Sequence, residues 1–177
     1  MSNFIPETTA GYKVFYGASA ASTDLLGIAD VTLSELTPLS TSLKGPGIIG
    51  EINVPIMGQV GSMTMSMNFR TINKDLSVFA MPQPHPIDLR AGVQQIDAAT
   101  GERTIQKVRI IAMGSTKKVA LGKFAMGEGN GSSVELEITR FTMMLDDVPN
   151  IVIDKLNNIY TVNGVDMLGG LNEALGI

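Results

Sequence analysis

Cysteine and tryptophan are absent from the 177 residues, and histidine occurs only once, as His85. Without a thiol, the chain can form no disulfide, no catalytic thiolate and no zinc–thiolate centre. The lone imidazole has no second histidine with which to complete a metal-ligand set or a nucleophile–base pair. Its position between Pro84 and Pro86 predicts a loop residue without a catalytic role. We therefore expect no enzyme active site, no bound metal and no cofactor.

Four short stretches contain part of a binding motif but lack the residues that would complete it. The glycine-rich run 127–131 and the basic run 114–118 do not have the spacing of a phosphate-binding loop. Stretch 97–102 lacks the alternating oxygen ligands of a calcium loop, and a hairpin turn explains it better. Adjacent Asp146 and Asp147 would point to opposite faces of a strand, so we expect a solvated turn there.

Aromatic residues are also scarce, at 5% of the chain, whereas methionine occurs 11 times. A soluble β-sandwich module that binds carbohydrate or peptide is an alternative from a different functional class, but such modules use exposed aromatic rings for stacking. The composition therefore speaks against it. The methionines are expected to fill irregular gaps in a core or between subunits.

The formal net charge of -4 argues against a nucleic-acid-binding protein, because affinity for DNA comes mainly from lysine and arginine. The charges are unevenly distributed along the chain: residues 97–123 are mostly basic, and residues 124–177 are mostly acidic. Ordinary solvated faces would explain this distribution. Alternatively, one basic and one acidic surface would suit head-to-tail association between copies of the chain.

Length and hydrophobicity predict one globular domain, since 177 residues can bury a single core and 44% of them are hydrophobic. The N-terminal residues lack the basic start and apolar run of a signal peptide, and no apolar stretch is long enough to span a membrane. We expect the chain to be made and kept in a cytoplasm, without binding a membrane.

Alternation of apolar and polar residues is the main structural signal. It is clearest over residues 63–69, and it recurs over residues 134–145 with a slip of one position after Arg140. A period of two that slips by one predicts a long strand with a β-bulge. The remaining strands are expected at 12–16, 28–36, 48–57, 87–96, 104–113 and 119–126, with a further β-rich run from Ile151 to Ile159.

The expected fold is mainly β, an antiparallel β-sandwich or partial barrel with one or two short helices. Asn73 is positioned to cap a helix that continues to Ala80. The single domain over residues 1–177 would include an N-terminal arm at about 1–10, a projecting loop at about 37–47 and a C-terminal helix at about 165–175. Pro55 predicts a strand at a sheet edge or bulge.

The C-terminal sequence carries a resemblance to a known family. The runs Thr139-Arg-Phe-Thr-Met-Met-Leu-Asp-Asp147 and Val162-Asn-Gly-Val-Asp166, together with the N-terminal run Leu26-Gly-Ile-Ala-Asp-Val-Thr-Leu-Ser-Glu-Leu36, resemble the major tail tube proteins of contractile-tailed bacteriophages. Tubes of R-type bacteriocins belong to the same family, and the tube protein of type VI secretion shares its fold. A glycine in a left-handed turn is expected at Gly164.

The resemblance implies a structural protein that forms hexameric rings, which stack into the hollow inner tube of a contractile tail. The inner sheets of the subunits would join into one β-barrel, through which DNA passes into the host cell without specific binding. Implied partners are further copies of the chain and the sheath, tape measure, baseplate and tail terminator proteins. The implied location is the virion tail, assembled in the bacterial host cytoplasm. A headless R-type bacteriocin or related injection system is the alternative within the family.

Two sets of residues are candidates for roles in such a tube. The lumen should be acidic or neutral, because a wall that bound DNA tightly would arrest it. Polar strand faces are the candidates for its lining, although the outer surface is an equally good location for them: Glu51, Asn53, Thr64, Ser66, Asn68, Glu135 and Glu137. The projecting loop has no local reason for its length, so we expect it to contact the neighbouring ring through Leu39, Ser40, Thr41, Ser42, Leu43 and Lys44.

Overall fold

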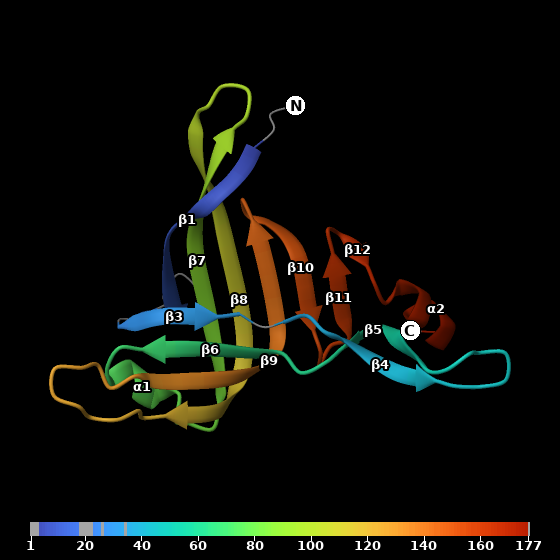
Figure 1. The fold of residues 1–177 in the computed structure, drawn as a ribbon, viewed down its shortest axis with the longest axis horizontal. Coiled ribbons are helices and arrows are strands. Elements are labelled where there is room, and N and C mark those ends of the chain that lie inside the picture. The colour runs from blue at the N-terminus through green and yellow to red at the C-terminus, as the bar shows by residue number, and fades with distance from the viewer. Residues whose placement is uncertain (1–3, 18–22, 26, 34, 177) are drawn as a thin grey trace.

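A computed structural model describes residues 4–17, 23–25, 27–33 and 35–176, and it confirms a mainly β, antiparallel fold with two short helices (Figure 1). The strands are β1 (Phe4–Tyr16), β2 (Thr23–Asp24), β3 (Ile28–Thr32), β4 (Pro38–Leu43), β5 (Ile52–Val60), β6 (Thr64–Phe69), β7 (Pro84–Asp97), β8 (Arg103–Ala120), β9 (Ser132–Leu145), β10 (Val148–Asp154), β11 (Ile159–Val162) and β12 (Val165–Asp166). The helices are α1 (Lys74–Val78) and α2 (Gly169–Leu175).

Strand β9 organises the fold because it belongs to two layers. Its first half, residues 132–137, pairs with β6, while its second half, residues 140–145, pairs with β10. The opposite edge of both halves pairs with β8, and the register slips where Gly114 faces Ile138 and Met113 faces Arg140. The slip confirms the predicted β-bulge. Figure 1 shows the result: β6 and the start of β9 run horizontally across the lower part of the nearly vertical strands β7 and β8.

The core fills the space between these two layers. The lower layer consists of β3, β6, the first half of β9 and the end of β8, and the upper layer of β1, β7, the rest of β8, the second half of β9 and β10. From the lower layer, β6 and β9 contribute alternate residues that are fully buried: Met65, Met67, Phe69, Val134, Leu136 and Ile138. From the upper layer, the facing residues are Val14, Ile87, Leu89, Ile110, Ala112, Phe141 and Ile153. Two strands that place every second side chain in the core leave the intervening polar side chains on the opposite face.

Glycine is required where the two layers meet. A Cβ atom at Gly114 would lie 2.3 Å from the carbonyl oxygen of Glu137, because β8 and β9 approach closely at the bulge. Beside it, the Arg140 guanidinium binds the buried Asp154 carboxylate at 2.6 Å. Burial acts to raise the pKa of Asp154, but hydrogen bonds from Asn157 and Arg140 outweigh it, and the pKa is lowered. The Asp154 carboxylate is therefore stabilised in its ionised form next to the β-bulge of β9.

Strands β4 and β5 form a separate two-stranded hairpin that projects beyond the layers (Figure 1). The predicted loop at 37–47 is therefore largely strand, and the predicted strand 48–57 starts later, at Ile52, and continues to Val60. Pro55 does lie on an edge strand, since β5 pairs only with β4 among the described residues. The base of the hairpin packs against the C-terminal strands, since Gly58 of β5 lies next to the Leu168 side chain, whereas its tip has no second layer among the described residues.

Both helices form near their predicted positions. The Asn73 side chain accepts a hydrogen bond from the Leu76 backbone N–H at 2.9 Å and so caps α1, as expected. Helix α2 is shorter than predicted, because Val165 and Asp166 form strand β12. The turn before β12 contains Asn163 and Gly164, both with positive φ angles, which confirms the left-handed turn expected at Gly164.

The structure differs from the expectations for the N-terminal arm and for residues 119–126. Residues 4–10 of the expected N-terminal arm form the first part of β1 and pair with β7, while residues 1–3 lie outside the described residues. The strand predicted at 119–126 does not form: residues 119 and 120 end β8, and 121–131 are a loop. The hairpin predicted at 87–113 is confirmed, with longer strands and a turn at Asp97.

Candidate functional site

His85 is not the loop residue that its flanking prolines suggested. It lies in β7, is fully buried, and its Nδ1 atom is 3.0 Å from the Tyr16 hydroxyl. Its Nε2 atom is 3.1 Å from the Met81 carbonyl oxygen, and the Phe79 ring packs against the imidazole. A carbonyl can only accept a hydrogen bond, so Nε2 carries a proton and donates to Met81. Both ring nitrogens are used in holding the fold together.

Within the described ranges, no three histidine, cysteine, aspartate or glutamate side chains are grouped so that they could hold a metal ion. None of the helices in this part of the chain has the length and apolar character needed to cross a membrane. The features that remain are surfaces: one polar sheet face, two free strand edges, a projecting hairpin and an apolar groove.

The polar sheet is the four-stranded layer made of β3, β6, the first half of β9 and the end of β8. Thr64 pairs with Glu137, Ser66 with Glu135, and Asn68 with Ser133. Residues opposite each other in an antiparallel pair share a face. The structure thus brings five of the seven lumen candidates onto the face of this sheet that points away from the core.

Lysines from β8 and from the turn after β10 balance the glutamates on this face. Lys117 binds Glu135 at 3.0 Å, and this hydrogen bond raises the pKa of Lys117. Glu137 accepts a hydrogen bond from Ser62 at 2.7 Å and lies 3.8 Å from Lys155. The face is therefore polar and close to neutral, rather than acidic as the two glutamates alone would make it.

The sequence analysis missed the contribution of β3 and β8 to the polar sheet. Asp30 lies opposite Asn68 and accepts its amide hydrogen bond, while Thr32 lies opposite Ser66. Polar Asp30 and Thr32 flank Val31, so a short alternation was visible in the sequence. No local signal identifies the end of β8 as part of this sheet, because its partner β9 lies beyond the 121–131 loop.

Both outer strands of the polar sheet have a free edge. Among the described residues, β3 pairs only with β6, and the pairing of β8 with β7 ends at Ser115, so residues 116–120 have no paired strand on that side. The Thr116 hydroxyl reaches across, donating to the Phe79 carbonyl oxygen at 2.7 Å. A cleft of about 560 Å³ runs beside the β8 edge, and an apolar cleft of about 370 Å³ opens beside β3. Unpaired strand edges are templates for pairing with another chain.

The β4–β5 hairpin has one apolar and one polar face. Leu43 pairs with Ile52, and Thr41 with Val54, while Ile56 continues the same face. On the other face Ser42 donates a hydrogen bond to Glu51, and Lys44 forms an ion pair with it at 2.9 Å. These hydrogen bonds, from Ser42 first and then Lys44, lower the pKa of Glu51.

The remaining two lumen candidates, Glu51 and Asn53, therefore lie on the hairpin and not with the other five. The candidates for ring contact lie here as well, and all of them are exposed: Leu39, Ser40, Thr41, Ser42, Leu43 and Lys44. The large apolar side chains of the hairpin, Leu39, Leu43, Ile52, Val54 and Ile56, are 38–51% exposed. A contiguous apolar surface of this kind marks an interaction site.

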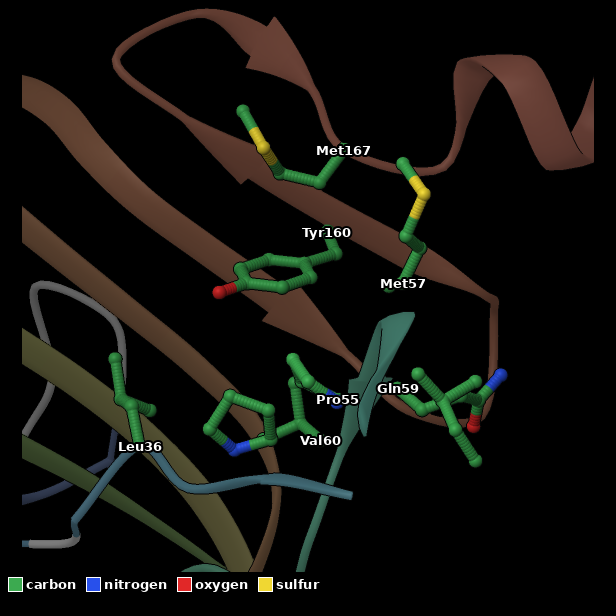
Figure 2. Close-up of a pocket in the computed structure, with 10 residues that line it drawn as sticks. Leu36, Pro55, Met57, Gln59, Val60, Tyr160 and Met167 are labelled. Atoms are coloured by element: carbon green, nitrogen blue, oxygen red, sulfur yellow. The ribbon is translucent and has the colours of Figure 1, made fainter. Parts of the chain in front are cut away.

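At the base of the hairpin, β5 and the strands β11 and β12 enclose an apolar groove of about 290 Å³ (Figure 2). Tyr160 and Met167 line one side, and Pro55 and Val60 line the other. Gly58 makes the close approach possible, because a Cβ atom there would lie 2.1 Å from the side chain of Leu168.

The upper layer carries a different kind of surface on its outer face. Asp88 is fully buried there and binds Arg90 at 2.7 Å and Arg109 at 2.8 Å. Burial acts to raise the pKa of Asp88, but the hydrogen bonds from Arg109 and Arg90 prevail and lower it. The Arg90 guanidinium also lies over the Phe15 ring, 4.6 Å from its centroid. The outer faces of the two layers thus differ in charge. The outer face of the upper layer carries a cluster of basic side chains, whereas the acidic and basic side chains of the polar sheet nearly cancel.

Comparison with known proteins identifies the family. The family described as Phage tail tube protein FII matches residues 18–176. The tail tube protein of Escherichia phage P2 is 27% identical over 155 residues, which make up 85% of this chain and 88% of the P2 protein. The predicted resemblance is confirmed: the chain belongs to the Phage tail tube protein FII family, and it is a structural subunit of a phage tail, not an enzyme.

Proposed function

We propose that six copies of the chain form a ring in which their polar sheets join into one closed β-barrel, and that stacked rings make the conduit for DNA in the tail. The observation that carries this proposal is the polar sheet itself: four strands with a buried apolar face, a nearly neutral outer face and two free edges. The similar protein of a phage supports DNA, rather than the cargo of a headless particle, as what passes through the tube.

The strand directions allow the ring to close. Each neighbouring pair in the order β3, β6, β9, β8 is antiparallel, so β3 and β8 run in opposite directions. When the β8 edge of one copy meets the β3 edge of the next, the new pair is antiparallel as well. The junction is head-to-tail, with Asp30 at one edge and Lys117 and Lys118 at the other. Such an interface generates a ring if the rotation closes.

Ring size follows from the strand count. Six copies with four strands each, spaced about 4.8 Å apart and tilted by about 40°, give a barrel with a backbone radius of about 24 Å. On the face proposed to line the lumen, Thr64 and Ser66 would narrow it less than the longer Glu135 and Glu137. A nearly neutral lining would let DNA slide, because a wall rich in lysine or arginine would bind its phosphates.

Stacking would use the hairpin. In Figure 1 it extends beyond the right-hand end of the polar sheet, roughly along the direction of β6 and β3. Barrel strands lie within about 45° of the barrel axis, so a segment that continues their direction leaves the ring toward its neighbour. The apolar face around Leu43, Ile52 and Val54 would be buried against that next ring.

The sheath, tape measure, baseplate and tail terminator proteins are further proposed partners, and the host cytoplasm is the proposed site of assembly.

The absence of native cysteine gives a direct test of ring closure. We expect that Thr32→Cys on β3, combined in one chain with Lys118→Cys or Ala120→Cys on β8, will give covalent oligomers up to a hexamer under oxidising conditions for at least one pair. Opposite residues of paired strands have Cβ atoms close enough for a disulfide. Denaturing gels without reductant measure the result.

The matched control combines Thr32→Cys with Thr100→Cys, which lies at the exposed turn between β7 and β8. This pair should remain monomeric on the same gel. If neither of the two edge pairs forms covalent oligomers in preparations that contain tubes by negative-stain microscopy, the β3 and β8 edges are not joined as proposed.

A further inference from the structure

The apolar groove between β5 and the strands β11 and β12 lies at the same end of the molecule as the β4–β5 hairpin (Figures 1 and 2). Its walls are mostly apolar, and two methionines stand at its rim. Met57 is 85% exposed and lies opposite Met167 across the opening. Methionine adapts its shape to a partner and makes favourable contacts between its sulfur and aromatic rings. The groove is therefore suited to an apolar, preferably aromatic, side chain.

The loop 121–131 projects at the opposite end of the molecule, beyond the left-hand end of the polar sheet (Figure 1). It carries two of the most exposed apolar side chains among the described residues, Phe124 at 88% and Met126 at 103%. A large apolar patch on a projecting loop marks a contact with another molecule. None of the described residues of the protomer buries either side chain.

The base of this loop is fixed although its tip is exposed. The Asn130 side chain is buried and donates a hydrogen bond to the Leu121 carbonyl oxygen at 2.9 Å. The Lys123 N–H donates to the Asn130 carbonyl oxygen, also at 2.9 Å. Gly122 has a φ of 73°, and a Cβ atom there would lie 1.8 Å from the same oxygen. The loop thus presents Phe124 from a defined base, which reduces the entropy lost on binding.

We propose that Phe124 and Met126 of one copy insert into the groove between β5 and β11–β12 of a copy in the adjacent ring. This inference rests on the proposed stacking of rings. Rings that stack in one direction bring opposite ends of the chain together, so the contact is heterologous and repeats along the tube. The groove is continuous with the hairpin surface that faces the same neighbouring ring. In the stack, this apolar surface of one copy would meet the apolar 121–131 loop of the next.

A cross-linking experiment separates this contact from ring formation. Met57→Cys and Phe124→Cys are introduced in one chain, which has no native cysteine, and assembled tubes are treated with a short bis-maleimide. We expect covalent polymers longer than six chains, since the contact links successive rings. The matched control combines Phe124→Cys with Ile105→Cys, an exposed position on β8 outside the groove, and should give no such polymers.

A second pair of variants tests the chemistry of the contact. Phe124→Ser should raise the concentration needed for tube formation by about tenfold or more, because a buried aromatic side chain is lost at every contact. Phe124→Leu, which stays apolar, should assemble near the native concentration. Tubes in which Met57 and Phe124 do not cross-link, or which form equally well with Phe124→Ser, would overturn the inference while leaving the proposed tube intact. If purified protein forms neither rings nor tubes, the proposed function fails and the inference fails with it.

Discussion

Shortening the β4–β5 hairpin should give protomers that fold normally but no longer form tubes. Replacing residues 41–54 by Asn-Gly joins Ser40 to Pro55, which already face each other, through a two-residue turn that suits a hairpin. The removed residues are all exposed or intermediate in the protomer, so the free energy of unfolding should change by about 1 kcal/mol or less. Negative-stain microscopy and thermal unfolding measure the two outcomes.

Substitutions on the two faces of the hairpin provide the matched comparison. Val54→Ser with Ile56→Ser makes two of the five exposed apolar side chains polar and should block polymerisation as the shortened hairpin does. Ser42→Ala with Asn53→Ala changes as many residues on the polar face and should leave tubes intact. Normal tubes from the shortened chain would show that the rings stack without this hairpin.

Lysines on the polar sheet should stop DNA passage without stopping assembly. Thr64→Lys, Ser66→Lys and Asn68→Lys place three positive charges on the face proposed to line the lumen. Repeated in every ring, they would bind DNA phosphates and hold the polymer in the tube. We expect the titre of a phage carrying these changes to fall by about a thousandfold or more, and DNA release in vitro to recover at high salt because salt weakens such contacts.

The control replaces the same three residues with glutamine, which adds length but no charge. It should leave both the titre and the salt dependence of DNA release close to native. A lysine variant that forms tubes and infects normally would place the polar sheet away from the DNA path.

The parts of the fold with a local signal were predictable from the sequence. The alternation over 63–69 and its slip after Arg140 identified β6, β9 and the bulge, because burial of one face imposes a period of two. The Asn73 cap and the left-handed turn at Gly164 were equally local. Each depends on residues within a few positions of one another.

The errors concern residues whose environment is set by distant partners. His85 is buried because Tyr16, which is 69 positions away, meets its ring. The end of β8 is a strand because β9 returns beside it after the 121–131 loop. The same is true of the candidate site: alternation placed Thr64 and Glu137 on polar faces, but only strand register shows that they share one. Methionine use was ambiguous, since Met65 is in the core whereas Met57 is at the surface.

The orientation of the subunit in the tube is the central claim, and electron cryo-microscopy of purified tubes tests it most directly. We predict a map in which the polar sheet, with Thr64, Ser66 and Glu135, lines the lumen, and in which β8 of each copy lies antiparallel to β3 of its neighbour. A lumen lined by the opposite face of the protomer, with Arg90 and Arg109 toward the channel, would contradict this account.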